Sequence, residues 1–145
     1  MPHALTSNLL HCVFSTKGRT GSIPDPDALG RYLAGVAREK KIPLIVTGGT
    51  NNHVHILIAL PAATPLAKAI QDLKGNSSRW LNQKSPGFAW QEGYAAFSVS
   101  QSNKQAVMNY ICDQPEHHAR RTFEEELVAM LRKSEIEYDP RYILG

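Results

Sequence analysis

Two histidines stand one residue apart, at His53 and His55, at the start of the apolar run HVHILIAL. Side chains alternate between the two faces of a strand, so both imidazoles would project opposite to Val54 and Ile56. Their backbone positions would lie about 7 Å apart, a separation that one divalent cation can bridge. The pattern therefore permits a metal site, although two strand histidines hydrogen-bonded to neighbours would have the same sequence.

Tyr110 and Gln114 lie four residues apart in the later segment NYICDQPEHH. On the helix that this segment predicts, residues with that spacing share one face. The Gln114 carbonyl oxygen could join the two imidazoles around Mg²⁺ or Mn²⁺ and leave positions open for a phosphate oxygen. The residues alone also allow a plainer interpretation, in which Tyr110 is a core aromatic and Gln114 is an amide at the helix end.

Tyrosine chemistry at this place would need help from a cation. A phenol with a pKa of about 10 is a weak nucleophile at neutral pH. A metal ion that withdraws charge from a phosphate group lowers the barrier and stabilises the negative charge that develops. Attack by Tyr110 on a phosphodiester would then leave a phosphotyrosyl intermediate.

The predicted secondary structure would place these residues on and above one sheet. Short apolar runs rich in β-branched residues predict strands, and apolar residues at helical spacing predict helices between them. The strands cover residues 8–16, 42–50, 53–60 and 93–101, and the helices cover residues 27–41 and 64–83. This order predicts an α+β fold of the ferredoxin-like type, a four-stranded antiparallel sheet with two helices on one face.

Two further helices are predicted after the sheet. The first, residues 102–114, carries Tyr110 and ends before Pro115. The second, residues 122–134, has a Thr122 cap and acidic residues in its first turn, where negative charge suits the positive end of a helix. These acidic residues, which receive no catalytic role in this interpretation, are Glu124, Glu125 and Glu126.

Length and composition limit the class of protein. With 145 residues, a net charge of +3 and a pI near 9.0, the chain predicts a single domain over residues 1–145 that is compatible with a polyanionic partner. No apolar run approaches the roughly 18 to 20 residues of a membrane-spanning helix, and the N-terminus lacks the form of a signal peptide. We therefore expect a cytoplasmic protein without a membrane partner. Cys12 and Cys112 stand alone, which argues against a disulfide framework or a thiolate zinc site.

Five segments, in order along the chain, resemble one family. They are HCVFSTKGR, HVHILIALP, LKGNSSRWLN, WQEGYAAFSVS and YICDQPEHHARRTFEEEL. Together they make the chain similar to the single-tyrosine HUH transposases of IS200-like insertion sequences, from about residue 7 to the C-terminus. One departure is Asn52, because the position before the first histidine is often acidic in related proteins.

The resemblance implies a ferredoxin-like domain that cleaves and rejoins single-stranded DNA at insertion-sequence ends. Carried over, His53, His55 and Gln114 are the metal ligands for Mg²⁺ or Mn²⁺, and Tyr110 is the nucleophile. The tyrosine would remain joined to the 5′ phosphate and leave a free 3′ hydroxyl. Members of the family are similar in being dimers that act on DNA with hairpin-forming ends, so we expect a homodimer, with the site completed in cis or in trans.

Folded single strands of DNA need basic groups for their phosphates and aromatic faces for unstacked bases. The family resemblance favours contacts from the predicted second helix and from the glycine-bearing loop after the first strand, although solvated surface charges would have the same pattern. The predicted DNA-binding residues are Lys17, Arg19, Lys74, Ser77, Ser78 and Arg79.

Other functions remain open at this point. A ferredoxin-like sheet is also the scaffold of non-catalytic nucleic-acid-binding domains, although the exposed aromatics of an RNA-binding sheet are not evident. A zinc protein could use the histidine pair together with His117 and His118, although no cysteine ligands accompany them. A domesticated relative that binds dispersed repeats would keep the same residues, and His117 and His118 receive no definite role.

Overall fold

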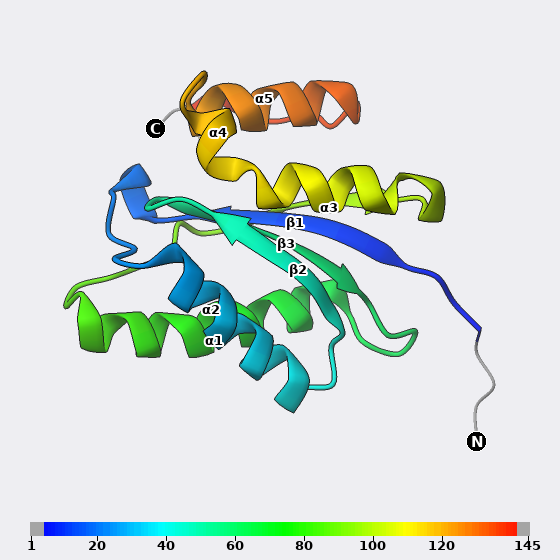
Figure 1. Cartoon of the computed structure of the whole chain (residues 1–145), viewed down its shortest axis with the longest axis horizontal. Coiled ribbons are helices and arrows are strands. Elements are labelled where there is room, and N and C mark those ends of the chain that lie inside the picture. Colours follow the sequence, from blue (N-terminus) through cyan, green and yellow to red (C-terminus); the bar gives the residue numbers. More distant parts are fainter. Residues whose placement is uncertain (1–4, 142–145) are drawn as a thin grey trace.

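A four-stranded antiparallel sheet forms the centre of the molecule, with the strand order β2-β3-β1-β4 (Figure 1). The computed structural model describes residues 5–141. The strands are β1 (Leu9–Ser15), β2 (Leu44–Gly49), β3 (His53–Ala59) and β4 (Ala95–Val99). Each of the four predicted strands is present, most of them with shorter ends, and β2 and β3 form an antiparallel hairpin. The predicted α+β fold class is therefore confirmed.

Two long helices cover one face of this sheet, as predicted (Figure 1). α1 (Pro26–Glu39) begins after Asp25, whose carboxylate accepts hydrogen bonds from two backbone N–H groups of the first turn. α2 (Leu66–Lys84) begins two residues later than predicted, with Pro65 at its N-cap position and no side-chain cap. The apolar sides of both helices pack on β1 and β3 and form the main core. None of the helices within residues 5–141 combines the length and apolarity needed to cross a membrane.

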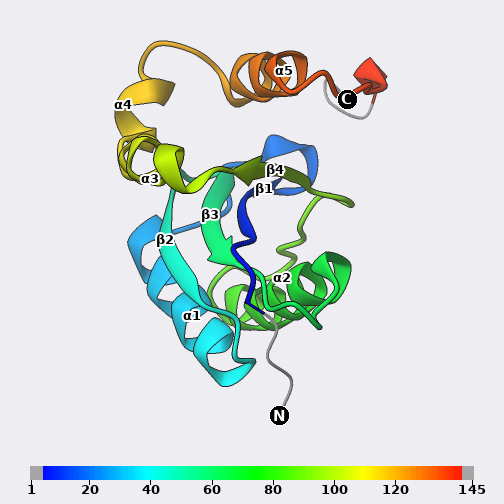
Figure 2. The same cartoon turned by 90° about the vertical axis from the view of Figure 1, so that its right-hand side faces the viewer.

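Three helices cover the opposite face of the sheet. They are α3 (Lys104–Cys112), α4 (Gln114–His118) and α5 (Phe123–Lys133). Figure 1 shows them above the sheet, with α1 and α2 below it. Figure 2 shows α3 next to the sheet on the β2 side and α5 farther from the sheet, above β1 and β4. The C-terminal part of the chain thus forms a third layer, which encloses the side of β3 that carries the two histidines.

The predicted helix that carries Tyr110 is divided in two. α3 ends at Cys112, and the chain turns at Asp113 before α4 begins. Pro115 lies in the first turn of α4, where its missing N–H removes no intrahelical hydrogen bond. The prediction of one helix that continues to Gln114 is therefore wrong, and the proline starts a helix instead of ending one.

Gly48 on β2 lets α3 approach the sheet closely. It lies opposite His55 in the β2–β3 pairing, and a Cβ atom at this position would lie 2.1 Å from the carbonyl oxygen of Ile111. Any side chain would push α3 outward together with Tyr110, which precedes Ile111. A glycine here therefore sets the distance between the tyrosine helix and the histidines.

α5 begins with the predicted Thr122 cap. The Thr122 side chain accepts a hydrogen bond from the Glu125 N–H, and the Glu125 carboxylate accepts one from the Thr122 N–H. Phe123 and Leu127 then pack against Val13 of β1 in a second, smaller core. This core holds α5 over the histidine face of the sheet.

Candidate active site

His53 and His55 lie on the face of the sheet that α3, α4 and α5 cover. Both side chains are fully buried, at 0% exposure. Val54 and Ile56 point to the main core on the other face, as the alternation of a strand predicts. The centroids of the two imidazole rings lie 5.1 Å apart. The strand therefore presents two ring nitrogens to one small, enclosed volume.

One ring nitrogen of His53, Nδ1, forms hydrogen bonds with neighbouring side chains. Nδ1 lies 2.8 Å from Asn52 Oδ1 and 3.0 Å from Thr50 Oγ1. An amide oxygen only accepts hydrogen bonds, so Nδ1 carries the proton and donates it to Asn52. Burial, followed by the nearby His55, lowers the pKa of His53 to about 3, so the ring is neutral and Nε2 keeps a free lone pair. Asn52 thus supplies the acceptor that an acidic residue would supply at this position.

His11 on β1 contacts the corresponding nitrogen of His55. His11 Nε2 and His55 Nδ1 lie 2.7 Å apart, and both side chains are buried. Burial lowers the pKa of His11 to about 3 and also lowers the pKa of His55, so both rings are neutral. When the proton between them is on His55 Nδ1, the Nε2 lone pair of His55 is free to bind a cation. His11 thus orients a candidate ligand.

Gln114 reaches the histidines from the first turn of α4. Its side chain is buried, and Oε1 lies 3.0 Å from His53 Nε2. The amide nitrogen donates to Glu126 Oε2 at 3.1 Å, and this contact turns the oxygen toward the histidines. The structure therefore brings together the three residues that the sequence predicts as metal ligands, His53, His55 and Gln114.

Glu126 on α5 adds a carboxylate to this cluster. Oε1 lies 3.0 Å from His55 Nε2, 3.2 Å from His118 Nε2 and 3.8 Å from His53 Nε2. Burial opposes ionisation of this group, but hydrogen bonds from His55 and other neighbours outweigh burial and hold the pKa of Glu126 below its usual range. The cluster therefore contains a buried carboxylate at neutral pH.

The donor atoms of the cluster fit around one metal ion. Four side chains offer one atom each, all within 4.8 Å of one another: His53, His55, His118 and Glu126. Ligand atoms at about 2.1 Å from a shared ion lie about 3.0 to 3.4 Å from each other, close to several distances in the cluster. In addition, His53 Nε2 has no proton and faces the Gln114 oxygen at 3.0 Å. Two lone pairs that face each other repel, and a cation between them removes the repulsion.

Tyr110 projects from α3 to the edge of the cluster. Its hydroxyl donates a hydrogen bond to Glu126 Oε2 and accepts one from Arg121 at 3.4 Å. Burial, followed by the hydrogen bond to Glu126, raises the pKa of Tyr110 to about 12, so the phenol keeps its proton at neutral pH. The predicted nucleophile is therefore separated from the histidines by a single carboxylate.

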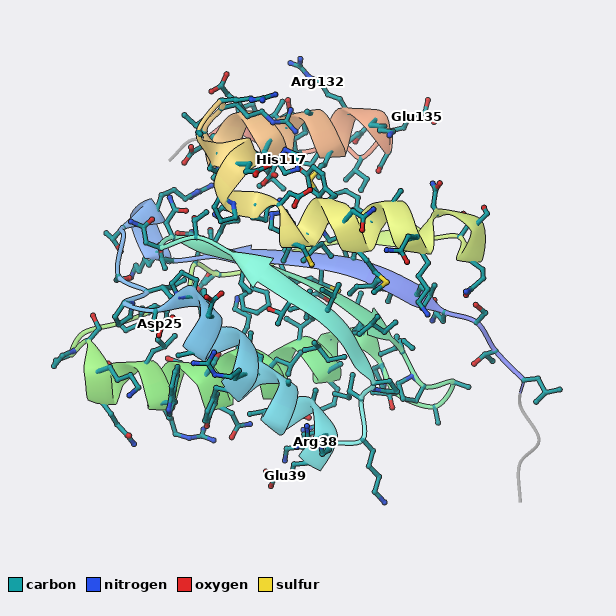
Figure 3. All side chains as sticks on the ribbon, viewed as in Figure 1. Asp25, Arg38, Glu39, His117, Arg132 and Glu135 are labelled. Atoms are coloured by element: carbon teal, nitrogen blue, oxygen red, sulfur yellow. The ribbon has the colours of Figure 1, made fainter. Side chains whose placement is uncertain are left out.

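The two adjacent histidines of α4 differ in position. His118 belongs to the cluster, because its ring lies 4.3 Å from that of His53 and its Nε2 contacts Glu126. His117 stacks on the Tyr110 ring with 4.5 Å between the centroids, and Figure 3 shows it where α4 meets α5. A zinc site made of all four histidines would need both residues, and in the described part of the chain only His118 joins the pair on β3.

Two predicted DNA-binding residues of α2 form hydrogen bonds within the protein. Ser77 is buried, donates a hydrogen bond to the Leu73 carbonyl oxygen and accepts one from Trp90. The Lys74 ammonium group donates to two carbonyl oxygens of the loop before β4, each at 2.8 Å. Both residues lie on the face of the sheet opposite to the cluster (Figure 1). In this conformation Ser77 is not accessible to DNA.

The other predicted DNA-binding residues lie at or near the surface. Lys17 and Arg79 are exposed, and Ser78 is half-buried. Arg19 forms an ion pair with Glu124 at 3.3 Å, which connects the loop after β1 to the start of α5. Among the predicted DNA-binding residues, which all lie in the described part of the chain, Arg19 is the one with an ion pair to α5, the helix that carries Glu126.

His11 and Glu126 could not be assigned to the site from the sequence. A histidine in an apolar strand has no distinguishing pattern, and the glutamates at the start of α5 suit a helix N-terminus. One usable signal existed, because Glu126 lies between Phe123 and Leu127 on the apolar side of its helix. A carboxylate at such a position is rare unless it has a partner.

The fold and the buried histidine pair point to one class of protein, the IS200-like transposases. The model of this family, described as "Transposase IS200 like", matches residues 4–114. The match covers more than half of the chain, so the chain belongs to this family. It includes the histidine pair and Tyr110 but ends before α5 and Glu126. No curated protein matches the chain.

Solved structures agree with this fold. A candidate transposase from Deinococcus radiodurans R1 superposes with a TM-score of 0.63 at 21% identity, over 77% of this chain and 93% of that one. A REP-associated tyrosine transposase bound to a REP hairpin superposes with a TM-score of 0.62 at 12% identity, over 81% of this chain and 72% of that one. At these identities the likeness establishes the fold alone.

Proposed function

We propose that the protein cleaves and rejoins single-stranded DNA at insertion-sequence ends, with Tyr110 as the nucleophile and a divalent metal beside it. One observation carries this proposal: the Tyr110 hydroxyl and the histidine pair converge on the same carboxylate, Glu126. A nucleophile next to a set of metal-binding atoms is the arrangement that transfer of a phosphoryl group to tyrosine needs. Membership of a transposase family supports DNA as the substrate.

The proposed reaction exchanges one phosphate ester for another. The Tyr110 oxygen forms a bond to phosphorus, and the bond from phosphorus to the 3′ oxygen of the DNA breaks. The phenol gives up its proton, and the departing 3′ oxygen takes one up, so no net proton is consumed. The tyrosine stays joined to the 5′ phosphate until a 3′ hydroxyl of another end reverses the step. No nucleotide cofactor is needed, because the ester bond is conserved.

His53, His55 and Gln114 would hold the metal ion. When bound, Mg²⁺ or Mn²⁺ supplies positive charge to a phosphate oxygen and stabilises the negative charge that develops there. Imidazole nitrogens favour Mn²⁺ over Mg²⁺, which prefers oxygen ligands and retains its water. Such charge matters for Tyr110, because its raised pKa makes the free phenolate scarce at neutral pH.

A polar cleft of about 650 Å³ beside the cluster is the proposed path of the DNA strand. Arg19, Arg120 and Arg121 line this cleft together with His118, Glu124 and Glu125. The three arginines outnumber the two carboxylates, and their positive charge suits a phosphate backbone. Arg121 also contacts the Tyr110 hydroxyl, so the cleft leads to the nucleophile. This position supports Arg19 as a DNA contact.

A DNA hairpin is the proposed partner, and the solved relative bound to a REP hairpin supports it. Lys17, Ser78 and Arg79 remain proposed contacts, whereas Lys74 and Ser77 would first have to leave their internal hydrogen bonds. A homodimer is also proposed. The tyrosine and the histidines of one chain already lie together, which favours a site completed in cis.

A second candidate function is that of a domesticated relative that binds dispersed repeats. The solved structure of a REP-associated tyrosine transposase with a REP hairpin favours it. Such a protein would keep the same site residues, so the DNA beside its gene separates the two candidates. Imperfect palindromes near both ends of the gene would mark a mobile element, and their absence would favour the domesticated protein.

Formation of a covalent adduct tests the proposal. Wild-type protein, Mn²⁺ and single-stranded DNA from the flanks of its gene should yield a protein joined to a 5′ phosphate, visible on a denaturing gel. Tyr110→Phe removes only the hydroxyl and should yield none, whereas Tyr94→Phe, at an exposed tyrosine, should behave as wild type. An adduct with Tyr110→Phe, or none with wild type, contradicts the mechanism.

A further inference from the structure

We propose that Glu126 joins the metal site to the nucleophile: its Oε1 is a ligand of the ion, and its Oε2 positions the Tyr110 hydroxyl. This inference rests on the proposed function and deepens it. It gives a role to α5, which lies outside the residues 4–114 that the family model matches. It also adds a charged ligand to a predicted set of two imidazoles and one amide.

The two oxygens of the Glu126 carboxylate have different neighbours. Oε1 faces ring nitrogens, at 3.0 Å from His55 Nε2 and 3.2 Å from His118 Nε2. Oε2 accepts hydrogen bonds from the Tyr110 hydroxyl and, at 3.1 Å, from the Gln114 amide nitrogen. A carboxylate that binds an ion through one oxygen keeps the other for hydrogen bonds. Both roles can therefore be filled at the same time.

Glu126 is also a buried negative charge without a permanent positive partner. Within residues 5–141 its ion-pair partners are His53, His55 and His118. Imidazole rings carry a charge only when protonated, so none of these is a fixed cation. Hydrogen bonds hold this carboxylate in its charged form but do not neutralise the charge. A divalent cation next to Oε1 would supply the compensating positive charge.

The position of Glu126 is set by packing on both sides of it. The Phe123 ring lies 4.4 Å from the ring of His53, and Leu127 packs in the same small core as Val13. A functional group on a packed helix is held more accurately than one on a loop. This accuracy is what a residue that orients a nucleophile requires.

The hydrogen bond to Glu126 determines the direction of the Tyr110 hydroxyl. Its hydrogen points at Oε2, so the lone pairs of the hydroxyl oxygen point away from the carboxylate. Arg121, which lines the polar cleft, contacts that oxygen from another direction. A misplacement of about 1 Å in such a nucleophile can reduce a rate by about 10²-fold. Loss of the hydrogen bond should therefore slow the attack even when the metal site is filled.

Glu126→Gln tests both roles, because it keeps the size of the side chain and removes its charge. The Kd for Mn²⁺, measured by calorimetry without DNA, should rise at least 10-fold, the lower end of what removal of even an outer partner does. The rate of adduct formation at saturating Mn²⁺ should fall by about 10²-fold. Glu39→Gln makes the same change at the exposed end of α1, on the opposite face (Figure 3), and should leave both quantities unchanged.

The two measurements separate the roles. An unchanged Kd for Mn²⁺ in Glu126→Gln overturns the ligand role, and an unchanged adduct rate overturns the positioning role. Wild-type protein that binds Mn²⁺ but forms no adduct with any single-stranded DNA contradicts the proposed function instead. In that case, weaker Mn²⁺ binding by Glu126→Gln would still support Glu126 as a ligand.

Glu126→Asp replaces the glutamine variant if circular dichroism shows that Glu126→Gln does not fold. It keeps the charge but withdraws the carboxylate by one methylene, so the group cannot reach both the ion and Tyr110. At least one of the two quantities, the Mn²⁺ affinity or the adduct rate, should fall 10-fold or more. Wild-type values for both would overturn the proposal.

Discussion

The two faces of the central sheet are buried to the same degree but by different chemistry. Phe14 and Ile56, under α1 and α2, are 2% and 0% exposed, and His53 and His55, under α3 to α5, are both 0% exposed. The first face is stabilised by the removal of hydrocarbon from water. The second contains buried polar side chains that form hydrogen bonds with one another. Burial therefore does not distinguish a core from a site in this protein; the partners do.

This difference determines how each face tolerates change. An apolar face accepts side chains of similar volume with small losses. A polar face loses more, because removal of one partner leaves another buried polar group unsatisfied. β3 contributes side chains to both faces. Substitutions at adjacent positions of this strand should therefore affect stability and metal binding differently.

Substitutions at Ile56 and His55 should have the largest effects, the first on the free energy of unfolding and the second on stabilisation by Mn²⁺. Ile56→Ala leaves a cavity in the main core and should lower the free energy of unfolding by about 2–5 kcal/mol. It should leave the added stability from Mn²⁺ intact, which is about 2.7 kcal/mol at 100 times Kd. His55→Ala should abolish that added stability. Urea denaturation with and without Mn²⁺ measures both quantities. If Mn²⁺ still raises the free energy of unfolding of His55→Ala, the claim that the two faces differ in this way is wrong.

Gly48→Ala should reduce activity more than stability. A Cβ atom there would lie 2.1 Å from the Ile111 carbonyl oxygen, so α3 must move outward with Tyr110. We expect the adduct rate to fall by about 10²-fold and the free energy of unfolding by about 1–3 kcal/mol. Gly35→Ala, where a Cβ atom meets nothing within 4 Å, is the matched control on α1 and should not reduce either quantity. A wild-type adduct rate in Gly48→Ala would mean that α3 does not rest on this strand.

His11→Phe should weaken metal binding without a comparable loss of activity at saturating metal. It keeps a ring in place but removes the nitrogen atom that forms the hydrogen bond with His55 Nδ1. Loss of such an outer partner raises the Kd of a metal by about 10–100-fold, which calorimetry with Mn²⁺ can measure. His11→Gln offers an oxygen as acceptor and should recover part of the affinity. If the phenylalanine and glutamine variants bind Mn²⁺ equally well, the hydrogen bond to His55 Nδ1 does not contribute to the metal affinity.

The fold could be predicted because its signals are local. Alternation in HVHILIA identified both faces of β3, and the spacing of Tyr110 and Gln114 placed these two residues together. The order of the elements then gave the architecture. Local signals failed where the chain itself changes direction: the turn at Asp113 divides the tyrosine helix, and Pro115 fits the start of α4.

The partners of the buried polar groups could not be predicted, because they depend on contacts between distant residues. Glu126 contacts His55 across 71 positions of the chain, and His11 contacts the same histidine across 44. The position of Glu126 on the apolar side of α5 indicates that it is buried, but this local signal does not identify its partners. For the same reason Lys74, which hydrogen-bonds to the loop before β4, resembled a surface charge.

Removal of the helix caps on the two faces should have the smallest effects on the free energy of unfolding and on Mn²⁺ affinity. Asp25 caps α1 over the apolar face, and Thr122 caps α5 over the polar face (Figure 3 labels Asp25). Replacement of either by alanine should lower the free energy of unfolding by about 1 kcal/mol, because each loses hydrogen bonds at a helix N-terminus. Only Thr122→Ala should also weaken Mn²⁺ binding, by less than about 10-fold, since α5 carries Glu126 and its packing through Phe123 remains. Equal Mn²⁺ affinities in the two variants and in wild type would show that the small core around Phe123 holds the carboxylate without help from the cap.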